Sequence, residues 1–168
     1  MVNMDYYLYY RDYIILDRSI LLKKKMISLK INNLHKDFSY QSKSIEHLCS
    51  EILTTQNYEH VTLAFIFCDD IKLNKLKIKY FNEDVLTDVL AFPFKNDAEL
   101  EAEIYISVDR AKENSRQNSV TLNNEIIRLI IHALLHLFGY NDSDKKSKEI
   151  MFKRQEKLVS EFANIDIL

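Results

Sequence analysis

The pattern of apolar and polar residues changes character several times along the chain, and each change marks an expected structural element. Four segments show the period-two alternation, or the short β-branched and aromatic runs, that are typical of strands. They are residues 26–32, 61–68, 87–92 and 103–108. Apolar residues three and four positions apart predict helices. These are residues 43–55, 70–80, 109–114 and 143–162, with Asp109 expected to cap the third.

The third strand is expected to end at a proline. Pro93 lacks the backbone N–H that a strand interior needs, so it is predicted to stop the strand. Residues 94–102, which carry three acidic side chains, then form a loop. Those acids would repel RNA, so this loop is expected to lie away from any phosphate path or to face a protein.

One more helix, within residues 121–142, differs from the others because it has almost no polar face. A helix that is apolar all round must be buried nearly all round, so we expect it to pack centrally against the sheet. Thr121 can cap its start, and Gly139, the only glycine of the chain, stands where a left-handed cap ends a helix. Both ends of the helix are therefore marked in the sequence.

The polar exceptions in this apolar helix are Arg128, His132 and His136. Residues four apart lie above one another on one helix face, so the two histidines present imidazole nitrogens about one turn apart. Such a pair can bind one Zn²⁺ ion. Because Gly139 lets the chain reverse, Asp142 can return to the same point. The spacing H-x3-H-x5-D therefore suggests a metal site.

A simpler interpretation is that the two histidines are hydrogen-bonded core residues. Each buried ring needs a polar partner, and an otherwise apolar helix offers few. A metal shared with Asp142 would supply that partner. The spacing alone leaves both interpretations open.

The elements together predict an α+β domain, with a mixed sheet of about four strands packed against several helices and the apolar, metal-binding helix at its centre. With 168 residues, 47% of them hydrophobic, the chain can build one well-buried core, so one domain is expected. Residues 1–25 are rich in tyrosine and end in three lysines before Met26. They are expected to be an N-terminal extension, formed as an amphipathic arm or a packed helix, or to precede a true start at Met26. The domain itself is expected at residues 26–168.

Charge and composition narrow the function. The net charge of −2 excludes an overall basic protein, so RNA must be held by a local patch. Cys49 and Cys68 are isolated, which indicates a reducing cytoplasm rather than a disulfide framework. The apolar runs near the start fall far short of the ~20 residues of a membrane span, and no secretory signal is evident.

Three segments resemble conserved motifs of one bacterial family. They are TDVLAFP at 87–93, EIYISVDRAKENS at 103–115 and HALLHLFGYND at 132–142. The family is YbeY, whose members are single-domain, zinc-dependent endoribonucleases of ribosomal RNA maturation, and the likeness runs from Met26 to about Phe162. It implies a single-strand-specific endoribonuclease active in ribosomal RNA processing and ribosome quality control. Its partners would be ribosomal RNA, the small ribosomal subunit and ribosomal proteins, in the cytoplasm, with no DNA and no membrane.

The resemblance also assigns residues. His132 and His136 match the family's zinc ligands, whereas Asp142 stands where the family has a third histidine. A carboxylate is still a zinc ligand, but it makes Mn²⁺ or Fe²⁺ more acceptable. Phe81 falls at the position of a family arginine, so this chain lacks that guanidinium; Arg128 can substitute for it or can simply pair with Glu125.

Two other functions remain as alternatives. One is a non-catalytic ribosome-assembly factor with a structural metal, because only Ser107, Asp109 and Asp88 offer themselves as a general base. The other is a metallopeptidase-like hydrolase. Ala133 argues against the peptidase, since the HExxH motif has its glutamate base at that position.

Overall fold

A computed structural model describes residues 13–17, 20–23 and 26–168 of the chain. The first two segments are the strands β1 (Tyr13–Asp17) and β2 (Ile20–Lys23), which pair antiparallel. Part of the predicted N-terminal extension is therefore a strand pair. The other residues of this extension, among them Lys24 and Lys25 just before Met26, lie outside the described residues.

The main sheet has four strands in the order β3-β4-β6-β5. They are β3 (Met26–Asn33), β4 (His60–Cys68), β5 (Val89–Asn96) and β6 (Glu99–Ser107). β3, β4 and β6 run parallel, and β5 is antiparallel to β6 at one edge. The predicted mixed sheet of about four strands is confirmed.

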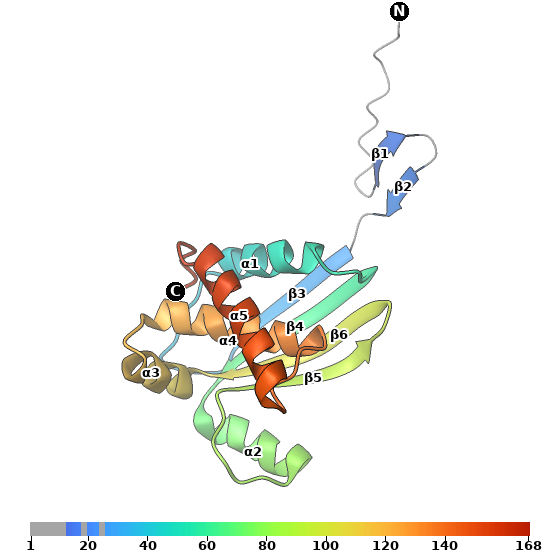
Figure 1. The fold of residues 1–168 in the computed structure, drawn as a ribbon. Coiled ribbons are helices and arrows are strands. Elements are labelled where there is room, and N and C mark those ends of the chain that lie inside the picture. Colours follow the sequence, from blue (N-terminus) through green and yellow to red (C-terminus); the bar gives the residue numbers. More distant parts are fainter. Residues whose placement is uncertain (1–12, 18–19, 24–25) are drawn as a thin grey trace, which may run out of the picture.

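Five helices complete the fold. They are α1 (Ser42–Thr54), α2 (Asp70–Phe81), α3 (Val108–Gln117), α4 (Leu122–Leu137) and α5 (Lys145–Glu161). Figure 1 shows α1, α3, α4 and α5 gathered on one side of the sheet, with α2 apart from them beyond its end. The core lies between the sheet and this helical layer. Ten of the sixteen residues of α4 are buried, as expected for a central helix.

The alternation of the strands explains which face meets the helices. In β6, Leu100, Ala102, Ile104 and Ile106 are buried in the core, while the residues between them point to the opposite face. The same holds for β4, where every second residue from Val61 joins the core. A period of two places alternate side chains on opposite faces, so the helices cover the apolar one.

The prediction that Pro93 ends its strand was wrong. β5 continues to Asn96, and the expected loop at 94–102 is a hairpin in which β6 already begins at Glu99. The register shifts between Pro93 and Lys95, so the proline lies next to a bulge on an edge strand. At such a position the missing N–H of proline does not remove a hydrogen bond between the strands.

The predicted cap of α3 was also wrong. The helix begins at Val108, one residue before Asp109, and Ser107 is its N-cap, accepting a hydrogen bond from the backbone N–H of Arg110 at 3.1 Å. Serine and aspartate are both good N-caps, so the local sequence did not separate them. Asp109 is thereby free for contacts outside the helix.

None of the helices in the described part of the chain combines the length and the apolar character needed to cross a membrane.

Candidate metal centre

The two ends of α4 are shaped by the residues that the sequence indicated. Thr121 accepts a hydrogen bond from the backbone N–H of Asn124 at 3.1 Å, which caps the start. Gly139 has a φ of +88°, and the N–H of Tyr140 returns to the carbonyl of Leu135 at 3.0 Å. Only glycine adopts such a φ without strain, so the chain reverses here and leads back along the helix end.

This reversal brings Asp142 to the two histidines. One ligand atom from each of His132, His136 and Asp142 lies within 4.8 Å of the others. The Nε2 atoms of the two histidines are 3.0 Å apart, and the rings stand edge to face. Two Zn–N bonds of about 2.0–2.1 Å at a tetrahedral angle would place such atoms about 3.3 Å apart, so the spacing fits one shared cation.

The other nitrogen of each ring is already held. His132 Nδ1 lies 2.9 Å from Oε1 of Gln155, and His136 Nδ1 lies 3.1 Å from the carbonyl oxygen of Tyr140. Both partners are acceptors, so each Nδ1 carries the proton and each Nε2 is left as a lone pair. Two lone pairs facing each other repel unless a cation lies between them, which is the arrangement of metal-binding histidines.

Electrostatics favour the same state. Burial lowers the pKa of His136, and His132 beside it lowers it further, while Tyr140 and Asp142 only partly oppose this. The ring is therefore neutral around pH 7, as a metal ligand must be. Asp142 itself is exposed, so the open side of the group faces solvent.

A pocket of about 230 Å³ opens beside His132. It is lined by Asp88, Asn114, Asn118, Glu125, Arg128, Leu129, His132 and Gln155. These residues come from the position just before β5, from α3 and its end, and from the facing sides of α4 and α5. The pocket thus offers carboxylate, amide and guanidinium groups next to the candidate metal ligands.

Arg128 is held between two carboxylates in this pocket. Its Nε lies 3.4 Å from Oε2 of Glu125, and an Nη atom contacts Glu156 on α5. Glu125 is 2% exposed, and its burial raises its pKa even though the guanidinium lowers it. The pairing of Arg128 with Glu125, considered as the alternative to phosphate binding, is therefore present.

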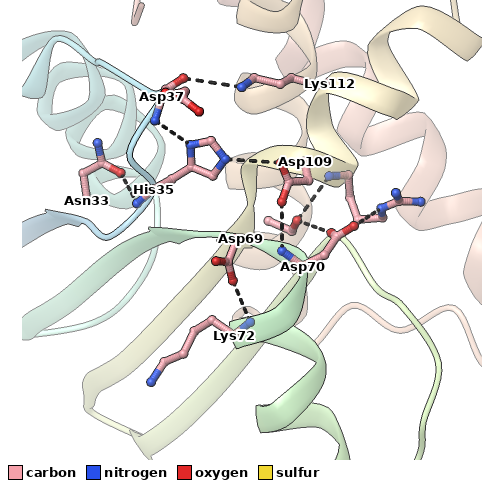
Figure 2. A network of polar contacts seen from close by, with 10 residues as sticks. Asn33, His35, Asp37, Asp69, Asp70, Lys72, Asp109 and Lys112 are labelled. Atoms are coloured by element: carbon pink, nitrogen blue, oxygen red, sulfur yellow. Dashed lines mark hydrogen bonds and ion pairs between the residues drawn. The ribbon is translucent and has the colours of Figure 1, made fainter.

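Asp109 belongs to a separate polar network, shown in Figure 2, and Ser107 joins the same network through Asp70. Ser107 is fully buried and donates to Asp70 at 2.5 Å. Asp109 accepts from the backbone N–H of Asp70 at 3.1 Å and lies 3.2 Å from Nε2 of His35. The network joins the ends of β3, β4 and β6, and neither residue lines the pocket beside His132. Their catalytic roles stay predictions.

Phe81, which the resemblance places at the position of a family arginine, contacts the ring of Phe92 instead. Its ring centre lies 6.0 Å from that of Phe92, and the side chain is 49% exposed. Phe81 is absent from the lining of the pocket beside His132.

Sequence inspection missed Gln155, which orients His132. Gln155 lies four residues after Met151 and three before Leu158, on the buried side of α5. A polar residue inside an apolar stripe was the available signal, because a buried amide must have a partner. Asn114 and Glu156 had no comparable signal, since their roles depend on how α3 and α5 pack against α4.

The fold and the site define a small α+β domain with a candidate His-His-Asp metal centre at the end of a buried helix. Comparison with known proteins identifies the family. Residues 30–163 match the family model described as Endoribonuclease YbeY, so the chain belongs to this family. It is an endoribonuclease by family, a hydrolase that acts on RNA.

Relatives named Endoribonuclease YbeY span most of the domain. The Amoebophilus asiaticus protein is 38% identical over 105 residues, covering 62% of this chain and 71% of its own. The Treponema denticola protein is 34% identical over 131 residues, covering 73% and 84%. A Thermotoga maritima protein solved in solution superposes with a TM-score of 0.56 at 27% identity, covering 80% of this chain and 88% of that one.

Proposed function

We propose that this chain is a single-strand-specific, metal-dependent endoribonuclease that cleaves ribosomal RNA during maturation and ribosome quality control. The observation that carries the proposal is the convergence of His132, His136 and Asp142, with both Nδ1 atoms satisfied by acceptors and both Nε2 atoms facing one point. Family membership supports the reaction class.

We infer that the three residues hold one Zn²⁺ ion, although the carboxylate also suits other divalent metals. Three protein ligands leave a coordination position for water, and the bound metal would supply Lewis acidity and a lower pKa for that water. The exposed position of Asp142 leaves the approach to this position open. The donor set thus fits a catalytic site rather than a closed, four-ligand one.

The pocket residues have distinct tasks in this proposal. The amide of Asn118 can donate hydrogen bonds to phosphate or ribose oxygens, whereas that of Asn114 is held by the carboxylates of Asp88 and Glu125. Arg128 lines the pocket, is held there by Glu125 and Glu156, and would stabilise charge on the phosphate. Asp88, which already accepts from Asn114 at 3.0 Å, is better placed than Ser107 or Asp109 to accept a proton there.

We further infer that residues 26–168 form the endoribonuclease domain and residues 1–25 an extension, which agrees with a family match over 30–163. We also infer that the protein acts in the cytoplasm, together with the small ribosomal subunit and ribosomal proteins and without a role on DNA or membranes. The exposed basic residues of α5, including Lys145, Lys148 and Lys153, offer a local positive surface close after Asp142.

The test compares two histidine variants. Purified wild type is expected to contain about one metal ion per chain and to cleave a single-stranded ribosomal RNA fragment, with cleavage abolished by a chelator. His136→Ala should lose both metal and cleavage, whereas His47→Ala, an exposed histidine on α1, should keep both. Ribosome binding without cleavage by metal-loaded wild type would favour the non-catalytic assembly factor. A wild type without stoichiometric metal would refute the centre.

A further inference from the structure

The sheet face opposite α4 carries a cluster of aromatic rings at its β5 edge. Phe92 on β5 alternates with Ala91, and Tyr105 on β6 alternates with Ile104, so both rings point away from the helical layer. The C-terminal end of α2 adds Tyr80 and Phe81 to this face. We call Tyr80, Phe81, Phe92 and Tyr105 the aromatic cluster.

Phe92 connects the cluster. Its ring centre is 5.1 Å from that of Tyr80, 6.0 Å from that of Phe81 and 5.9 Å from that of Tyr105, which it meets edge to face. Tyr80 is nevertheless 56% exposed and Phe81 49% exposed. Two neighbouring rings that keep half their surface in water offer stacking faces to a ligand.

A hollow of about 360 Å³ adjoins the cluster at Tyr105. Asn32 and Asn33 from the end of β3, Lys72 from α2 and Glu103 from β6 also line it. An asparagine amide donates and accepts at once, so Asn32 suits the edge of a nucleobase, and a lysine suits a phosphate. Asn33 is held by the Phe38 carbonyl and the His35 N–H. Glu103 is occupied, because it accepts from the Tyr105 hydroxyl at 2.8 Å.

Lysines of α2 bring positive charge to the cluster. Lys72, Lys75 and Lys79 are exposed on α2, and Lys79 Nζ lies 4.8 Å from the centre of the Tyr80 ring. The acids of α2 and the loop after it have their own partners: Asp69 accepts from the backbone N–H of Lys72 at 2.7 Å, Glu83 pairs with Lys77 at 3.3 Å, and Asp84 accepts from the Asn74 amide at 2.8 Å.

Two acidic residues of this face lie at its other end, at the start of β6. Glu99 and Glu101 stand at the opposite end of β6, and both contact Lys95. The C-terminal half of the face is therefore the half that suits an anion.

We propose that the aromatic cluster binds single-stranded RNA by stacking unpaired bases on Tyr80 and Phe81, with phosphates on the α2 lysines and one base in the adjoining hollow. Aromatic platforms with interleaved cations are how proteins hold single strands without sequence preference. Protein interfaces, in contrast, are depleted in lysine. The inference rests on the proposed function for the identity of the polymer.

The cluster is close enough to the candidate metal centre to share one RNA strand with it. Asp88 lines the pocket beside His132. The chain from Phe81 to Asp88 spans at most about 25 Å. That length corresponds to about seven stacked nucleotides at 3.4 Å each. A strand of twelve nucleotides is therefore long enough to reach both, and β5 is the strand that separates them.

The test measures RNA binding without cleavage. A fluorescently labelled, U-rich, twelve-nucleotide RNA is titrated by anisotropy with full-length His136→Ala protein in the presence of a chelator, so the result does not depend on catalysis. Adding Tyr80→Ala or Phe81→Ala should weaken binding about fivefold or more, since losing one base–aromatic stack costs about 1 kcal/mol or more. Phe94→Ala removes an equally exposed ring of β5 that has no ring contact among the described residues, and it should change affinity less than twofold.

A matched abasic RNA separates stacking from charge. The abasic RNA should bind weakly, and Tyr80→Ala and its parent protein should have the same affinity for it. Equal affinity of all variants for the normal RNA overturns the proposal, as does an equal loss of affinity for the abasic strand. The proposal is also overturned if the ring variants bind RNA normally and lose binding only to isolated ribosomal proteins. Thermal unfolding must show that the variants are as stable as Phe94→Ala. If wild type cleaves no RNA but the ring variants lose binding, the proposed function fails and this surface stands.

Discussion

Asp142 decides the chemistry of the candidate centre, because it is the single exposed member of the group. The resemblance in the sequence places it where the family has a histidine. Its carboxylate reaches the two imidazoles only through the reversal at Gly139. A charged oxygen in place of a neutral nitrogen makes the site harder and shifts preference toward metals that accept oxygen.

Asp142→Ala should therefore weaken Zn²⁺ binding by about 100-fold or more, since even removing a residue that only hydrogen-bonds to a metal ligand costs about 10–100-fold. Asp142→His should retain binding and favour Zn²⁺ over Mn²⁺ more strongly than wild type does. Competition with a chromogenic chelator measures both. Asn141→Ala, on the adjacent exposed residue, is the control, and an unchanged affinity in Asp142→Ala would remove the carboxylate from the centre.

Gln155 orients His132 without joining the group of ligands itself. Gln155→Met keeps the volume but removes the acceptor for His132 Nδ1, so the ring loses its fixed tautomer. We expect metal affinity to fall about 10–100-fold. Gln155→Glu restores an acceptor and should bind metal at least as tightly as wild type. Equal affinities of the methionine and glutamate variants would show that the contact does not orient the ring.

At the scale of the element, α4 must present its histidines in one register and then stop. Gly139 accomplishes the stop with a φ of +88°, and a Cβ added there would meet no atom within 4 Å. The requirement for glycine is therefore conformational and not a matter of space.

Gly139→Ala should lower the free energy of unfolding by about 1–2 kcal/mol, the cost of a left-handed conformation for a residue with a Cβ. Gly139→Asn should lose less, because asparagine tolerates this region better. Chemical denaturation gives both values. If alanine costs nothing, the turn can rearrange, and metal affinity should then reveal whether Asp142 still reaches the histidines.

At the scale of the whole molecule, the network around Asp109 ties three parallel strands together at their C-terminal ends. Partial burial raises the pKa of Asp109, but the backbone N–H of Asp70 and the His35 ring outweigh it, so the pKa is lowered overall. A lowered pKa in the folded state means that the ionised carboxylate stabilises the fold. This stabilisation is complete above the ordinary carboxyl pKa of 3.8 and is lost as the pH falls through the lower, folded value.

Asp109→Asn should accordingly be less stable than wild type at pH 7, by roughly 1 kcal/mol for the weakened charged hydrogen bonds. The difference should shrink as the pH falls below about 4, because the wild-type carboxyl then becomes neutral as well. Urea unfolding at a series of pH values measures this. A difference that stays constant with pH would show that ionisation of Asp109 contributes nothing.

Local sequence patterns predicted much of the fold because their causes are local. The run of β-branched and aromatic residues at 61–68, the cap Thr121 and the single glycine each act within a few residues, and β4 and α4 lie where these signals placed them. The passage of β5 through Pro93 could not be foreseen, since it depends on β5 being an edge strand.

The sequence by itself determined the register of the two histidines, because a helix places residues four apart on one face whatever surrounds it. Only the tertiary structure decided their environment. The packing of α5 supplies Gln155 and Glu156, and the sheet edge places Asp88 beside His132 while turning Phe92 and Phe81 to the opposite face. Such contacts join residues far apart in the chain, so no local pattern encodes them.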